Sequence, residues 1–188
     1  MQSETRENQE RSPISASGEF AAHAADWARP MVQAGLPENE ILTMLVNAAE
    51  HVAATSAVCS ILALDHEGLL RNAASPNLPA DYLAAIDRLK PNPRVGTCAA
   101  AAATGSVVVT RDFCADDKWA ELRHLPLALG FLGAWSMPIE GADGKVLGTL
   151  GTYFREPRTP SPEEVRGVEA LAAAAAIVLA KHRMRGSL

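Results

Sequence analysis

Cysteine is the side chain of this sequence best suited to chemistry, and Cys98 has the most informative position. It directly follows Gly96 and Thr97 and precedes alanines at 99–103. This order is typical of a tight turn that opens a helix, and the helix dipole lowers the pKa of a thiol at that end. Cys98, with Thr97 beside it, is therefore a candidate redox thiol, nucleophile or ligand contact. The alternative is a small buried side chain, because free cysteine is commonly buried.

The other two cysteines are Cys59 and Cys114, and both lie far from Cys98 in sequence. No cysteine or histidine pair has the spacing of a zinc site, and an odd number of cysteines favours reduced thiols over a disulfide framework. Cys59 falls in an apolar run and is expected in the core. Cys114 could approach Cys98 across a short strand, which leaves a thiol-based enzyme open as an alternative.

Aromatic residues form a second group of candidates. They make up only 5% of the chain, yet several fall between residues 113 and 153. With one methionine, they could line a pocket for a flat or apolar ligand, since small-molecule sites are mostly apolar. The alternative is that they form an ordinary core. The candidates are Phe113, Trp119, Trp135, Met137 and Tyr153. Asp112, next to Phe113, is expected to touch the ligand or to anchor the loop.

The elements that must position these residues can be predicted from periodicity. Apolar residues recur at helical spacing in residues 16–35 and again from 38 to 54. Two hairpins follow from apolar runs around turns at Asp65–Gly68 and Asp143–Gly144. Residues 91–130, between the hairpins, are expected to form small helices, loops and one short strand.

The last helix has the clearest start signal in the sequence. Ser161, Pro162 and Glu164 form a capping box, which predicts a helix from there to about Arg183. Its apolar positions cover more than one narrow stripe, so part can face the sheet and part a partner helix.

The order of elements predicts the fold class and the domain limits. Every close strand connection is hairpin-like, so we expect a largely antiparallel sheet in an α+β fold. Residues 1–15 are polar and without periodicity, which predicts a disordered leader. Residues 36–183 are expected to form one domain, with an N-terminal helix over 16–35 and a tail over 184–188.

Composition excludes several classes of protein. The net charge of −5 over 188 residues argues against a nucleic-acid surface, which needs a basic patch. The N-terminal residues do not resemble a signal peptide, and no apolar run reaches the roughly 20 residues that span a bilayer. We therefore expect a cytoplasmic protein without nucleic-acid or membrane partners.

Three local patterns resemble the GAF domain, a sensory and dimerising module of bacterial signalling proteins. They are Gly96–Cys98 before small residues, Asp112 with Trp119, and residues 135–139 followed by 143–149. The resemblance implies a central antiparallel sheet with the first and last helices on one face. It also implies a small-molecule ligand on the other face, under small helices and loops from Pro91 to Gly130. The terminal helices would form a parallel homodimer and pass the signal to an output domain or kinase.

The sequence also departs from the pattern of its relatives. Ala99 follows Cys98 where many relatives have glycine, and Leu129 and Leu132 occupy places where many have histidine and arginine. These departures remove polar groups on which a specificity for a charged ligand, carried over from the relatives, would depend. Some relatives bind haem through a histidine, which makes His124 a candidate ligand, with a surface or capping role as the alternative. The cofactor is not predicted.

The function predicted from the sequence is a non-enzymatic sensory domain that binds a small molecule and signals through a homodimer. One alternative is a dimerisation module of the same fold with a filled pocket. Another is a reductase of free methionine sulfoxide, since one GAF family performs that reaction with paired cysteines.

Overall fold

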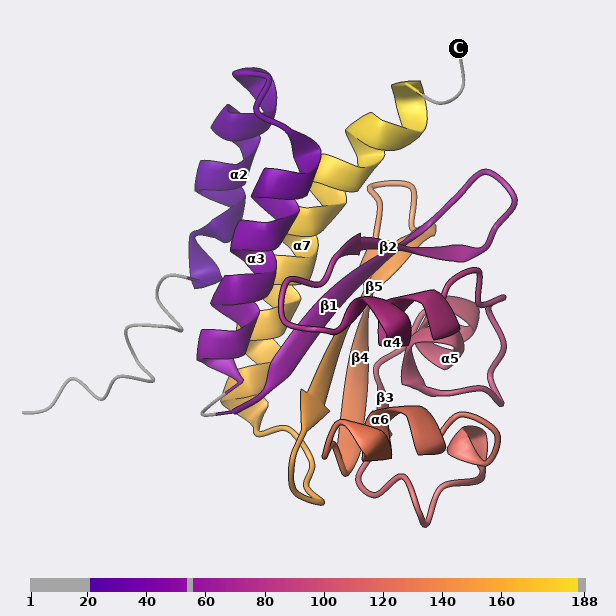
Figure 1. Cartoon of the computed structure of the whole chain (residues 1–188). Helices are drawn as coiled ribbons and strands as arrows, with labels where there is room; N and C mark the ends of the chain where they lie inside the picture. The colour runs from indigo at the N-terminus through magenta and orange to yellow at the C-terminus, as the bar shows by residue number, and fades with distance from the viewer. Residues whose placement is uncertain (1–20, 54–55, 186–188) are drawn as a thin grey trace, which may run out of the picture.

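The computed structural model describes residues 21–53 and 56–185 (Figure 1). The predicted leader, residues 1–15, lies outside the described residues, as do the last three residues of the predicted tail. A sheet in the middle of the molecule separates a layer of long helices from a layer of short helices and loops. The predicted α+β architecture, with helices on both faces of the sheet, is confirmed.

The sheet has five strands in the order β2-β1-β5-β4-β3, and every neighbouring pair is antiparallel, as predicted. Hairpins join β1 to β2 and β4 to β5, and β5 lies at the centre of the sheet. The strands are β1 (Val58–Leu64), β2 (Leu70–Ala74), β3 (Val108–Thr110), β4 (Gly133–Glu140) and β5 (Val146–Phe154).

Local chemistry explains the first hairpin turn. The Asp65 carboxylate accepts hydrogen bonds from the backbone N–H groups of Glu67 and Leu69, both at 2.9 Å. Gly68 has φ +75°, a conformation that costs glycine little and other residues more. Aspartate and glycine therefore close this turn as expected from the sequence.

The long helices cover one face of the sheet. They are α2 (Ala24–Gln33), α3 (Glu38–Val52) and α7 (Pro162–Arg185). In Figure 1, α3 and α7 lie against the sheet and α2 packs beside them. The second apolar stripe of α7 thus meets α2 of the same chain. We call the sheet face under these helices the helix side.

The opposite face carries the short elements. They are α4 (Ala80–Ala85), α5 (Thr97–Thr104), the 3-10 turn η1 (Asp117–Trp119) and α6 (His124–Ala128). Gly96 N donates to Lys118 O at 2.8 Å, which ties the start of α5 to η1. We call these elements the cover, and the sheet face beneath them the cover side.

The predicted capping box starts α7. Glu164 N donates to Ser161 Oγ at 3.2 Å, and Ser161 N donates to the Glu164 carboxylate at 2.6 Å. Arg158 makes two bonds to the same carboxylate, at 2.6 and 2.9 Å, and one to Ala53 O at the end of α3. Burial acts to raise the pKa of Glu164, but the bonds from Arg158 and Ser161 outweigh it and hold that pKa below its usual range. These contacts join the ends of α3, β5 and α7.

Candidate ligand site between the sheet and its cover

A row of hydroxyl groups crosses the cover side of the sheet at its centre. Strand register places Ser60 of β1 and Ser136 of β4 on either side of Gly151 in β5. A Cβ atom on Gly151 would lie 3.2 Å from Ser60 Oγ, 3.5 Å from Ser136 Oγ and 2.9 Å from Cys98 Sγ. The three polar side chains therefore converge over one glycine, and no larger residue fits there without a shift.

Helix α5 brings Thr97 and Cys98 down onto this row. Gly96 has φ +55° and precedes the helix, so the chain turns sharply toward the sheet. Cys98 Sγ lies 3.1 Å from Ser136 Oγ, and Ser136 Oγ donates to Thr97 Oγ1 at 2.9 Å. We call Ser60, Thr97, Cys98, Ser136 and Thr149 the polar seam.

Two members of the polar seam make no well-formed hydrogen bond to a described residue. The hydroxyl oxygens of Ser60 and Thr149 are buried, both residues are 0% exposed, and the polar neighbour of Thr149 is the Cys98 thiol, whose pKa it helps to lower. Register places Thr149 beside Leu62, two residues from Gly151 on the same face of β5. A buried hydroxyl without a partner costs about 1–3 kcal/mol, so such groups in a native fold call for a partner.

The environment of Cys98 contradicts the prediction of a low thiol pKa. Burial raises the pKa of Cys98, and nearby hydroxyls of Ser136, Thr149 and Thr97 offset only part of this effect. Loss of water around the buried thiol is the largest cause of the shift. Cys98 is therefore a protonated, buried thiol.

An aromatic cluster lies next to the polar seam on the cover side. Phe113 and Trp119 pack with their rings tilted by 50° and their centroids 4.3 Å apart, and Phe131 packs against Tyr153 at 5.3 Å. The Tyr82 hydroxyl donates to the Tyr153 hydroxyl at 3.0 Å, and burial raises the pKa of both phenols. Three of the predicted ligand-binding residues, Phe113, Trp119 and Tyr153, thus share one cluster.

The structure separates Trp135 and Met137 from the other predicted ligand-binding residues. Both pack on the helix side, in the core formed with α3 and α7. The reason is the alternation of a strand: Trp135 pairs with Thr152, whereas Ala134 pairs with Tyr153 on the cover side. They are not available to a ligand under the cover.

The remaining candidates lie at the edge of the cover or on the helix side. The Asp112 carboxylate accepts a bond from Cys114 N at 2.8 Å, so it anchors its own loop. His124 is exposed at the start of α6. Cys114 is exposed while Cys98 is buried. On the helix side, Cys59 Sγ lies 3.4 Å from Thr152 Oγ1, and burial raises the pKa of Cys59 to about 12.

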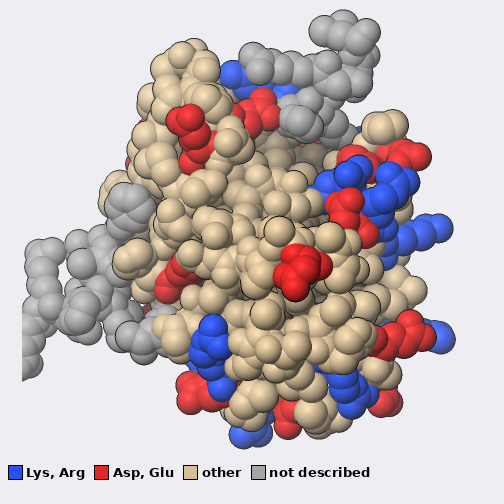
Figure 2. Space-filling model, in the orientation of Figure 1, with Lys and Arg blue, Asp and Glu red and all other residues tan. Residues whose placement is uncertain are grey.

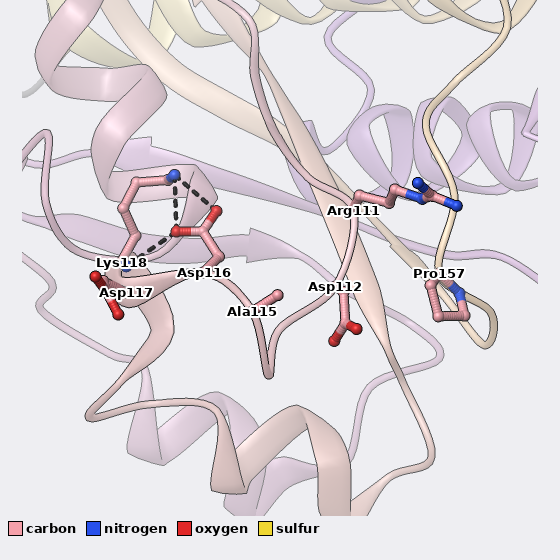
Figure 3. Close-up of a pocket in the computed structure, with 7 residues that line it drawn as sticks. All are labelled: Arg111, Asp112, Ala115, Asp116, Asp117, Lys118 and Pro157. Atoms are coloured by element: carbon pink, nitrogen blue, oxygen red, sulfur yellow. Dashed lines mark hydrogen bonds and ion pairs between the residues drawn. The ribbon is translucent and has the colours of Figure 1, made fainter.

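An open hollow of about 600 Å³ lies at the outer edge of the cover, near the end of β3. In Figure 3, Lys118 turns back onto Asp116, with a shortest separation of 2.7 Å, while Arg111 extends toward Pro157. The hollow shares no residue with the polar seam. Its lining consists of Arg111, Asp112, Ala115, Asp116, Asp117, Lys118 and Pro157.

Sequence reasoning missed three members of the polar seam. Ser60, Ser136 and Thr149 each lie in the middle of an otherwise apolar strand. Their position could have marked them as site residues, because a hydroxyl inside a buried strand needs a hydrogen-bond partner. Pairing of β1 and β4 with the two edges of β5 then brings these hydroxyls together.

Comparison with known proteins decides the family. A family model described as "GAF domain" matches residues 35–180. The chain is a GAF domain. This GAF domain is 32% identical over 149 residues to the "Methyl sulfide methyltransferase-associated sensor" of Methanosarcina acetivorans. The alignment covers 79% of this chain and 15% of that relative, so the chain spans a small part of the longer protein.

Solved GAF structures share the fold. The GAF domain of a phosphoenolpyruvate-protein phosphotransferase from Coxiella burnetii has a TM-score of 0.70 at 20% identity, covering 91% of this chain and 99% of that one. The phycocyanobilin-bound GAF domain of a cyanobacterial phytochrome has a TM-score of 0.62 at 15% identity, covering 89% and 96%. These structures show the fold, and the family model together with the sensor-named relative shows the family.

The described residues contain neither a candidate metal site nor a membrane-spanning helix. Among the described residues, no group of three histidine, cysteine, aspartate or glutamate side chains could hold a metal ion. Within the same part of the chain, none of the helices has the length and apolar character needed to cross a membrane.

Proposed function

We propose that this GAF domain binds a small molecule between the sheet and the cover, with its polar groups on the polar seam. The observation that carries the proposal is the pair of unpartnered hydroxyls, Ser60 and Thr149, fully buried beside an aromatic cluster. A ligand that pairs these groups would recover the free energy lost on burying them. The phytochrome relative is bound to phycocyanobilin, which supports ligand binding by the shared fold.

Signalling follows from where the bound molecule would act. The Gly96–Lys118 bond ties α5 to η1, so a ligand beneath them would change the packing of both elements. β5 carries Gly151 and leads through Arg158 into α7, which gives the site a connection to the terminal helices. Signalling would require two arrangements of the cover and the terminal helices. A ligand shifts the equilibrium between them only by the difference in its affinity for the two arrangements.

We place the homodimer at the outer surface of the helix layer. The middle of α7 is largely buried within one chain, so a partner would contact α2 and the outer face of α3. Met44 on α3 is 41% exposed, one of three large hydrophobic side chains that are exposed in the described part of the chain. Sedimentation velocity with and without ligand measures whether a dimer forms and whether the ligand alters it. An output domain or kinase would receive the signal.

The domain is proposed to bind its ligand without transforming it. A thiol reductase needs an accessible thiolate, whereas Cys98 is buried with a raised pKa. Turnover of free methionine sulfoxide by the purified protein, lost in Cys98→Ser, would overturn this part of the proposal.

Native mass spectrometry of the purified chain tests ligand binding directly. A retained small molecule that is lost in a Ser60→Ala, Thr149→Val double variant would support the sensor. The rival function is a GAF domain that only dimerises. The close packing of Trp119 over Gly96 favours this rival, since a Cβ atom added to Gly96 would lie 3.6 Å from the Trp119 ring. A protein that forms dimers and retains no molecule would support that rival.

A further inference from the structure

The polar seam has no charged side chain. The buried polar or charged residues in the described chain include one carboxylate, Glu164, and it lies at the start of α7 with Arg158. On the cover side, the buried polar groups are hydroxyls, a thiol and an indole N–H. All of these are neutral at physiological pH.

The surroundings of the seam also oppose charge. Apolar and aromatic residues surround it, with the Phe113–Tyr153 cluster on one side and Leu62, Leu70 and Ala99 on the other. Burial raises the pKa of Cys98 and Tyr153, which means that this region disfavours an anion. An ion brought here would lose its water without gaining a countercharge.

Charged groups at the edge of the cover are engaged with protein partners, and Arg155 lies over the Phe131 ring of the aromatic cluster, 4.7 Å from its centroid, and donates to Leu129 O. Lys118 pairs with Asp116 at the edge of the cover, and Asp112 holds its own loop. In Figure 2, charged side chains of both signs gather on the right and lower parts of the face, and one acidic side chain lies near its middle. These charges lie at the surface, outside the buried seam.

The unpaired groups define what a ligand must supply. The Ser60 and Thr149 hydroxyls can each donate one hydrogen bond and accept others. The Trp119 indole N–H, also buried and unpaired among the described residues, can only donate. A partner for all of these groups needs at least one hydrogen-bond acceptor, such as a carbonyl, amide or hydroxyl oxygen.

From these observations we infer that the ligand is a small uncharged molecule, with a hydrogen-bond acceptor that pairs with Ser60 and Thr149 and an apolar body beside the aromatic cluster. This inference rests on the proposed function, because it names the class of ligand for the same site. It separates neutral amides, ketones, alcohols and phenols from carboxylates, phosphates and amines.

Three molecules of the same shape and different charge test the inference. Benzamide is neutral, benzoate is an anion and benzamidine is a cation at pH 7. Binding of each to the full chain is measured by titration with two-dimensional amide NMR. We expect benzamide to bind at least tenfold more tightly than either ion, with shifts in β1, β5 and α5.

Variants locate the binding within the seam. The Ser60→Ala, Thr149→Val double variant should weaken benzamide binding at least tenfold. Thr152→Val is the matched control, since it makes the same change on the same strand but on the helix side, and it should leave binding unchanged. Near-ultraviolet circular dichroism checks that each variant is folded.

Several outcomes would overturn the inference. One is that benzoate or benzamidine binds as tightly as benzamide or more tightly. Another is that the double variant binds benzamide as well as the native chain does. A third is that no probe binds at millimolar concentration. Native mass spectrometry separates this failure from failure of the proposed function. A retained charged molecule that needs Ser60 and Thr149 would leave the sensor standing and reject only the neutral class. A protein without a retained molecule or probe binding would reject both.

Discussion

Two threonines on β5 show how the two faces of the sheet differ. On the helix side, Thr152 Oγ1 lies 3.4 Å from Cys59 Sγ, inside a core with Trp135. On the cover side, three residues earlier, the Thr149 hydroxyl is buried and has no partner in the described part of the chain. The helix side has an unpaired indole N–H at Trp135, whereas the unpaired groups of the cover side include two hydroxyls, those of Ser60 and Thr149. The two faces therefore differ in their hydroxyls, and the proposed ligand site uses that difference.

The largest effect should come from opening the helix side. Trp135 is 0% exposed, so Trp135→Ala should lower the free energy of unfolding by about 3–5 kcal/mol. Trp119→Ala should cost less, about 2–3 kcal/mol, since its cover segment can partly collapse into the space. Urea denaturation followed by circular dichroism measures both. Equal losses would remove the energetic contrast between the faces.

The Arg158–Glu164 pair provides the next test of the helix side. Glu164→Gln should destabilise the fold by about 2 kcal/mol at pH 7, between the values for exposed and buried pairs. The folded pKa of Glu164 lies below its ordinary value of 4.5, so the stability from this pair is complete above that pH. This contribution to stability is lost as the pH falls through the pKa that Glu164 has in the folded protein.

Thermal unfolding between pH 7 and pH 3 measures this contribution. The Glu164→Gln variant should lose less stability than the native chain over that range. Glu163→Gln is the matched control on the same turn, because the Glu163 side chain is 70% exposed, and its midpoint should match that of the native chain. Identical acid sensitivity of the native and Glu164→Gln proteins would contradict the role of the pair.

Substitution by valine should change the free energy of unfolding in opposite directions at the two threonines. Thr149→Val removes an unpaired buried hydroxyl and should stabilise the free protein by about 1 kcal/mol. Thr152→Val removes a paired hydroxyl and should destabilise it by about 1 kcal/mol. Urea denaturation without added ligand measures both. Destabilisation by Thr149→Val of the same size would show that its hydroxyl is satisfied in solution.

The smallest effect is on thiol reactivity, with no change in stability expected. Cys114 is exposed, whereas Cys59 and Cys98 are buried with raised pKa values. An aromatic disulfide reagent at pH 8 should therefore modify one thiol in the folded chain and all 3 in denaturant. Cys114→Ser should abolish the fast reaction. Rapid modification of Cys98 in that variant would show that the cover opens readily.

The sequence was sufficient to predict the fold because its strongest signals are local. Asp65–Gly68, Asp143–Gly144 and the Ser161 capping box each specify a turn or a helix start, and the structure contains all three. The family patterns then supplied the arrangement of the layers. These features need only neighbouring residues to form, which is why they can be read without coordinates.

The site was harder to predict, since it depends on strand register and on burial. Trp135 and Tyr153 both seemed suitable for a pocket, but register directs them to opposite faces. The thiol of Cys98 has the expected place at the start of α5, yet its pKa follows burial, which sequence does not give. Ser60 and Thr149 become neighbours only through the pairing of β1 with β5.

Arg158 has a mechanical consequence for α7. It bonds to Glu164 in the first turn and to Ala53 O, so this end of the helix is fixed to the end of α3. The 24 residues of α7 make a rod about 36 Å long, at about 1.5 Å per residue. A tilt of about 5° at the fixed end would move the far end by about 3 Å, given that length. Any tilt of α7 about its fixed end would therefore be largest at Arg185.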